Sequence, residues 1–102
     1  MSEQTDTAAD EVVARHLVVH GHVQGVFFRG TTRQLAEERG IAGWVANRAD
    51  GTVEAWLEGE PVAVGELEAW IRAGGPPFAR VTDVQAEDAT PRGYGSFDVT
   101  GE

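Results

Sequence analysis

The chain has 102 residues, of which 41% are hydrophobic, and its formal net charge is −9 because 17 acidic residues oppose eight arginines. This length suits one domain with one modest core, and the negative charge disfavours binding to nucleic acid or to anionic membranes. The sequence contains neither cysteine nor lysine, which excludes a thiolate nucleophile, a cysteine-ligated metal, a P-loop lysine and a Schiff base.

The first segment, residues 1–11, carries four acidic residues, no cation and almost nothing to bury. We predict that it is a disordered acidic tail and that the domain covers residues 12–102. The segment lacks the basic and apolar stretches of a secretory signal, and no apolar run in the chain is long enough for a membrane helix. We therefore expect a cytoplasmic protein with no membrane partner, and the absence of cysteine agrees with this expectation.

The domain begins with a predicted strand and a predicted helix. Apolar and polar residues alternate over residues 15–23, which is the period of a strand. From Phe28 onward the apolar residues recur at helical spacing, so a helix is predicted to start there. Gly40 is well placed to end this helix in a left-handed conformation.

The next elements are a hairpin, a second helix and two more strands. Strands are predicted over residues 41–48 and 52–58, on either side of an Asp-Gly turn, which is a strong hairpin signal. Pro61 opens a second helix, where its missing N–H has no cost. Strands are also predicted over residues 80–87 and 96–100, although the second of these is short.

The predicted order is βαββαβ, with room for a short extra strand. Two helices must then cover one face of an antiparallel sheet. This arrangement is an α+β, ferredoxin-like sandwich of two layers built on the split βαβ motif. The outward residues of the third strand are Glu54, Trp56 and Glu58, and they predict a solvated second face of the sheet.

A glycine-rich segment, GHVQGVFFR at residues 21–29, lies between the first strand and the first helix. Its glycines let backbone N–H groups converge, and the helix N-terminus adds partial positive charge, so the segment suits a phosphate-sized anion. Arg29 in the first helical turn adds two parallel donors and a full charge. The alternative interpretation is a glycine-rich connection with a surface arginine, because short glycine motifs are weak signals by themselves.

A second polar residue, Asn47, ends the strand over residues 41–48 beside the tight turn. Its amide offers both a donor and an acceptor, which suits the binding of a water molecule. The alternative interpretation is that Asn47 only caps the turn through an Asx-type hydrogen bond.

At these residues the sequence closely resembles the acylphosphatase family. The first family motif, G-x-V-Q-G-V-x-F-R, stands at residues 21–29 without a departure. The second motif, Gly-aromatic-Val-x-Asn-x-x-x-Gly-x-Val followed by Gly six residues on, stands at residues 43–59. The resemblance covers about residues 15–99 and includes the predicted order of elements.

The resemblance implies a hydrolase that uses no metal or other cofactor and splits acyl phosphates into a carboxylate and inorganic phosphate. It also implies that Arg29 binds the phosphate through its guanidinium and that Asn47 orients the attacking water. No protein base is evident nearby, so a phosphate oxygen of the substrate is expected to take the proton from this water. Positioning and electrostatics suffice for such a reactive substrate. The loop residues implied to bind phosphate through backbone N–H groups are Gln24, Gly25, Val26, Phe27 and Phe28.

Other function classes stay open at this point. A non-catalytic module of the same fold would bind phosphate or another small anion, and a ligand-sensing domain would not need the glycine-rich loop. An RNA-binding domain shares the order of elements, but it would need aromatic and basic residues where Glu54 and Glu58 stand. A metal site on His16, His20 and His22 is disfavoured because the first two of these residues lie ~13 Å apart along a strand, too far for one ion. We expect a monomer that acts on small acyl phosphates.

Overall fold

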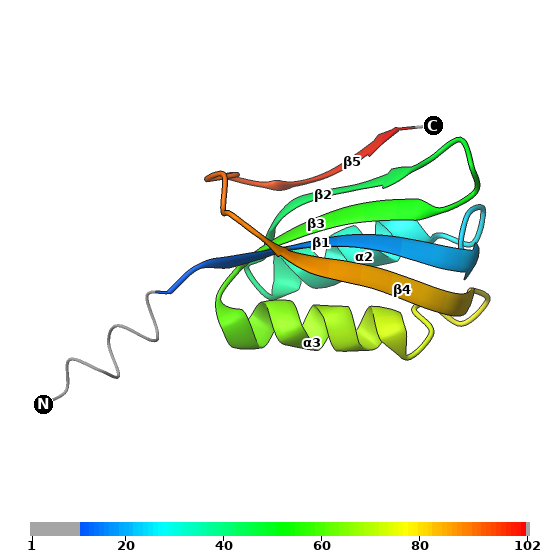
Figure 1. Cartoon of the computed structure of the whole chain (residues 1–102), viewed down its shortest axis with the longest axis horizontal. Coiled ribbons are helices and arrows are strands. Elements are labelled where there is room, and N and C mark those ends of the chain that lie inside the picture. The colour runs from blue at the N-terminus through cyan, green and yellow to red at the C-terminus, as the bar shows by residue number, and fades with distance from the viewer. Residues whose placement is uncertain (1–10, 102) are drawn as a thin grey trace, which may run out of the picture.

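Along the chain, the elements alternate as expected for the βαββαβ order, with a fifth strand at the end (Figure 1). The computed structural model describes residues 11–101, so the predicted tail lies outside the described residues except at Glu11. Every predicted element is present, and no bound differs by more than two residues. The elements are β1 (Val13–His22), α2 (Phe28–Glu38), β2 (Ala42–Asn47), β3 (Val53–Gly59), α3 (Pro61–Arg72), β4 (Arg80–Ala89) and β5 (Phe97–Gly101).

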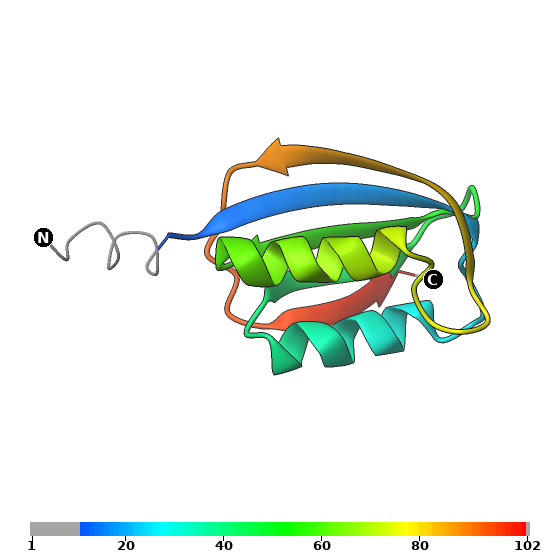
Figure 2. The same cartoon turned by 90° about the horizontal axis from the view of Figure 1, so that it is seen from below.

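The sheet has five strands in the order β4-β1-β3-β2-β5. Both helices cover the same face of this sheet, as Figure 2 shows, which confirms the predicted α+β ferredoxin-like sandwich. The sheet is antiparallel except that β5 pairs with β2 in parallel. The parallel pair departs from the predicted antiparallel sheet. The strands β4 and β5 lie at opposite edges, so the chain crosses from one edge to the other before β5 begins.

The core lies between the helices and one face of the sheet. On the two central strands, the register places the fully buried Leu17 opposite Ala55 and Val19 opposite Val53. Truncation of a buried leucine or isoleucine of this kind to alanine typically costs about 2–5 kcal/mol. The helices contribute the buried residues Phe28 and Ala36 from α2 and Ala63, Val64, Leu67 and Ile71 from α3. This packing fixes the strand ends relative to the start of α2.

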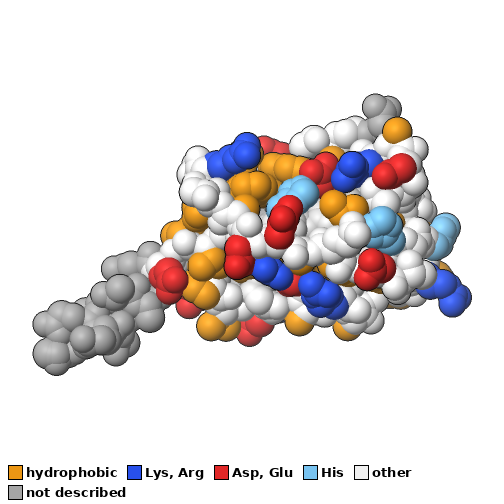
Figure 3. Space-filling model, in the orientation of Figure 1, with side chains coloured by type: hydrophobic (Ala, Val, Ile, Leu, Met, Phe, Trp, Pro, Cys, Tyr) orange, Lys and Arg blue, Asp and Glu red, His pale blue; other side chains and the backbone are white. Residues whose placement is uncertain are grey.

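The second face of the sheet is less solvated than the sequence predicts. Trp56 and Glu58 are only 6% and 4% exposed, because the connection over residues 90–96 covers them. The guanidinium of Arg92 lies 4.7 Å from the centre of the Trp56 ring, where it can make a cation–π contact. Glu54, on the same strand, is half-buried, and its carboxylate contacts His16 Nε2 at 2.6 Å. Figure 3 shows hydrophobic side chains among acidic and histidine side chains on the molecular surface.

The Glu58 carboxylate holds the covering connection in place. It accepts hydrogen bonds from the backbone N–H groups of Arg92, Gly93 and Tyr94 at 2.8–3.2 Å, and from the indole of Trp56 at 2.9 Å. Burial by itself would raise the pKa of Glu58, but these hydrogen bonds outweigh it and hold the pKa below its ordinary value. The ionised carboxylate therefore stabilises the folded state.

We expect Glu58→Gln to lower the free energy of unfolding at pH 7 by about 1–3 kcal/mol, because the amide turns a donor toward N–H groups. Since the folded pKa is depressed, the stabilising effect of Glu58 is complete above the unfolded value of ~4.3. It is lost as the pH falls from there through the folded pKa. Urea unfolding from pH 7 down to pH 3 should show the stabilities of the wild type and the variant converging. Equal stability at pH 7 would contradict this assignment.

No helix in the part of the chain that the structure describes is both long and apolar enough to cross a membrane.

Candidate active site

The loop over residues 23–27 connects the end of β1 to the start of α2. Gly25 and Phe27 both have left-handed backbones, with φ of 75° and 60°, and these two reversals curl the loop around a hollow. Phe28 is 1% exposed and fixes the first turn of α2 in the core. The N-cap residue, Phe27, makes no side-chain cap, so the first N–H groups of the helix have no capping acceptor from that residue. The residues of this first turn line the hollow.

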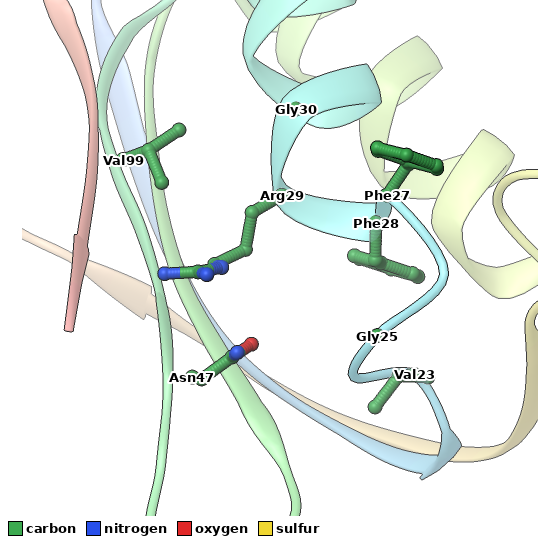
Figure 4. A pocket seen from close by; sticks show the side chains of 8 residues that line it. All are labelled: Val23, Gly25, Phe27, Phe28, Arg29, Gly30, Asn47 and Val99. Carbon is green, nitrogen blue, oxygen red and sulfur yellow. The ribbon is translucent and has the colours of Figure 1, made fainter. Parts of the chain in front are cut away.

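The hollow is a pocket of about 310 Å³ at one end of the sheet. In Figure 4 the guanidinium of Arg29 and the amide of Asn47 come from separate elements and lie beside the same space. The residues that line this pocket are Val23, Gly25, Phe27, Phe28, Arg29, Gly30, Asn47 and Val99. The structure thus brings together five of the seven residues that the sequence analysis assigned to the site.

Arg29 lies half-buried in the first turn of α2, and β5 holds its side chain. Its Nη1 donates a hydrogen bond of 2.9 Å to the carbonyl oxygen of Thr100. A guanidinium has five N–H donors in a fixed planar fork, so this bond orients the group and leaves donors for a ligand. The carbonyl belongs to the parallel edge strand, and no local sequence pattern predicts that contact.

Asn47 is the last residue of β2, where it pairs with Val53. Close approach of β2 to β3 requires glycine at position 43, because a Cβ there would lie 1.9 Å from the carbonyl oxygen of Trp56. The following turn is closed by Asp50, whose carboxylate accepts hydrogen bonds from the N–H and the hydroxyl of Thr52 at 3.0 and 2.6 Å. Asp50 therefore closes this turn through Asx-type hydrogen bonds.

The hydrogen bonds that Asp50 accepts from Thr52 lower the pKa of the Asp50 carboxyl below its ordinary value. An ionised carboxylate therefore stabilises this turn.

Gln24 links the loop to the hairpin turn beside Asn47. Its Nε2 donates to the carbonyl oxygens of Arg48 and Thr52 at 2.8 and 2.9 Å. Gln24 and Val26 do not line the pocket, although the sequence analysis placed both in the phosphate-binding loop. The side chain of Gln24 is a direct link between the two halves of the site.

The sequence analysis did not name three lining residues, which are Val23, Gly30 and Val99. Val23 lies within the first motif and Gly30 directly follows it, so their place at the pocket follows from the loop itself. Val99 comes from β5, and only the three-dimensional position of that strand shows that it reaches the pocket.

The fold and the site together define a ferredoxin-like protein in which the loop after β1, an arginine and an asparagine surround one pocket. A family model described as Acylphosphatase matches residues 15–99. An acylphosphatase from Gloeobacter violaceus is 47% identical over 87 residues, which are 85% of this chain and 92% of that protein. The chain belongs to the acylphosphatase family, whose members act on acyl phosphates.

Solved structures agree with this assignment. An acylphosphatase from Coxiella burnetii superposes with a TM-score of 0.83 at 39% identity, covering 87% of this chain and 93% of that one. The crystal structure of an acylphosphatase from Bacillus subtilis gives a TM-score of 0.82 at 35% identity, covering 86% and 98% of the two chains. The activity of the chain is that of an acylphosphatase.

We expect Gln24→Leu to lower kcat for benzoyl phosphate by about tenfold or more, because the loop and the hairpin lose their shared hydrogen bonds and the pocket loses its geometry. Steady-state kinetics would measure this effect. Gln34→Leu is the matched control, since Gln34 is an exposed glutamine whose amide donates to Glu38 on the neighbouring turn of α2. An unchanged kcat in Gln24→Leu would show that the link does not matter for turnover.

Proposed function

We propose that the chain hydrolyses the carboxyl–phosphate bond of acyl phosphates in the pocket between the loop and Asn47, and that it does so without a metal ion or other cofactor. One observation carries this proposal. A guanidinium and a side-chain amide from distant parts of the chain border a single pocket at a helix N-terminus (Figure 4). This combination supplies positive charge for a phosphate and a polar group for a water molecule.

The loop and Arg29 would bind the phosphoryl group. The backbone N–H groups of residues 24–28 donate to the phosphate oxygens, and the N-terminus of α2 adds partial positive charge. Arg29 contributes a full charge and parallel donors, and its bond to Thr100 keeps the guanidinium in place before the substrate arrives. These groups act on the charge of the phosphoryl oxygens in the ground state and in the transition state.

Asn47 would orient the attacking water. The water oxygen forms a bond to phosphorus while the bond from phosphorus to the acyl oxygen breaks, and the acyl group leaves as a carboxylate. The proton of the water passes to a phosphoryl oxygen of the substrate, so the products are a carboxylate and inorganic phosphate. Because the carboxylate is a good leaving group, correct positioning of the water and the phosphate provides most of the catalysis.

We also propose that the protein works in the cytoplasm as a monomer that needs no nucleic acid. The support for a monomer is that the loop, Arg29 and Asn47 already surround a pocket within a single chain. The net charge of −9 disfavours a nucleic-acid partner. Sedimentation of the protein at assay concentration tests the monomer, and a dimer would contradict it.

Arg29 and Asn47 should fail in different ways when they are replaced. We expect Arg29→Gln to lose both turnover and inhibition by inorganic phosphate, because Arg29 binds the phosphate throughout the reaction. We expect Asn47→Ala to lower kcat by roughly a hundredfold or more, while the inhibition constant of phosphate stays within about twofold, because the amide acts on the water.

Steady-state kinetics with benzoyl phosphate and competitive inhibition by phosphate give both values. Arg33→Gln is a control on the same helix, since Arg33 is exposed and pairs with Glu37. Normal phosphate inhibition in Arg29→Gln would move the anion site elsewhere. A wild-type kcat in Asn47→Ala would remove Asn47 from the mechanism.

Inorganic phosphate should stabilise the protein without any metal. At a hundredfold excess over its Kd, a ligand that binds only the folded state adds about 2.7 kcal/mol. We expect the Tm to rise with phosphate concentration in the presence of EDTA at constant ionic strength. A rise that EDTA abolishes would show that the site requires a metal.

A further inference from the structure

Phe27, at the rim of the pocket, is 87% exposed, although it is a large apolar residue. An exposed phenylalanine buries almost no apolar surface against its own chain and so adds little to the stability of the fold. Its neighbour Phe28 shows the contrast, because that ring is 1% exposed and packs in the core. The ring of Phe27 is therefore free to contact a ligand in the pocket.

The backbone at Phe27 makes the residue type harder to explain by folding alone. Its φ of 60° is left-handed, and it is the only non-glycine residue with a positive φ among residues 11–101. Glycine or asparagine would adopt this conformation at lower cost. The loop needs the backbone shape to point its N–H groups into the pocket, but it does not need an aromatic ring for that purpose. An outlier of this kind at a binding site points to a functional constraint on the side chain.

The position of the ring relative to Asn47 indicates what it would contact. In Figure 4, Phe27 and Asn47 lie on opposite sides of the pocket. Phosphoryl transfer places the attacking and the leaving oxygens roughly in line on opposite sides of phosphorus. If the water lies beside Asn47, the leaving carboxylate and its acyl group lie on the side of Phe27.

We propose that Phe27 forms an acyl subsite and that the enzyme favours acyl phosphates with an aromatic or other apolar acyl group over those with a small one. This inference rests on the proposed function, because it takes the direction of the reaction from the role of Asn47. The ring stacks on the acyl group and shields its apolar surface from water. The loop binds the phosphate through its backbone and would therefore bind every acyl phosphate equally, so the ring supplies the discrimination.

The test compares kcat/KM for benzoyl phosphate and for acetyl phosphate in the wild type and in Phe27→Ala. Phe27 belongs to the loop that binds phosphate, so either rate alone could change when its side chain is removed, and the ratio of the two substrates is the quantity that reports the loss of the ring. We expect the ratio of the two kcat/KM values to fall by about tenfold in Phe27→Ala, because benzoyl phosphate loses its contact and acetyl phosphate has little to lose. Tenfold corresponds to about 1.4 kcal/mol. Dividing one substrate by the other removes their difference in intrinsic reactivity.

Two variants serve as controls. Phe27→Leu keeps an apolar side chain and should retain most of the preference for benzoyl phosphate. Phe78→Ala removes an equally exposed phenylalanine, 83% exposed, that does not line the pocket, and it should leave the ratio unchanged.

An unchanged ratio in Phe27→Ala would overturn the acyl subsite. An equal loss for both substrates would also overturn it, since the ring would then act by supporting the loop. Failure of the proposed function would give a different result from failure of the acyl subsite, because it would be seen in the Arg29 and Asn47 variants. In that case Arg29→Gln keeps normal inhibition by phosphate, or Asn47→Ala keeps its kcat, whatever the ratio shows in Phe27→Ala.

Discussion

The direction of two strands is the constraint on which this site depends. Both β1 and β2 pair antiparallel with β3, which lies between them, so both run the same way and their C-terminal ends emerge at one end of the sheet. Strands two positions apart in a sheet are separated by about 9.6 Å. This separation sets how far apart the two sides of the pocket lie. The loop that follows β1 and the asparagine that ends β2 therefore face each other across it.

The positive charge at this pocket is opposite in sign to the net charge of the whole protein. The chain carries a net charge of −9, yet the pocket offers a guanidinium and the N-terminus of a helix. Some acidic groups elsewhere have cationic partners of their own, as Glu68 has Arg15 at 2.8 Å. Hydrogen bonding to Arg15 is the main reason why the pKa of Glu68 lies below its ordinary value. The overall field disfavours long polyanions, whereas a small phosphate inside the pocket experiences mainly the nearby donors.

Local patterns in the sequence predicted the elements, the two motifs and the fold class, because each depends on residues that are close in the chain. The contacts that complete the site join distant residues. Arg29 contacts a carbonyl 71 positions away, and the side chain of Gln24 reaches 28 positions to Thr52. The burial of Glu58 likewise depends on N–H groups 34–36 positions away. Periodicity carries no information about such pairs, so the parallel edge strand and the covered sheet face could not be predicted from it.

The most direct test of the account is to observe which N–H groups respond when phosphate binds. The measurement is a titration of the ¹⁵N-labelled protein with inorganic phosphate in EDTA, followed by amide NMR spectra. The account predicts that the largest shifts, saturating together, occur at the amides of residues 24–28 and at the side chain of Arg29. Shifts centred on another surface, such as the sheet face around Trp56, or no saturable shift in the loop, would contradict it.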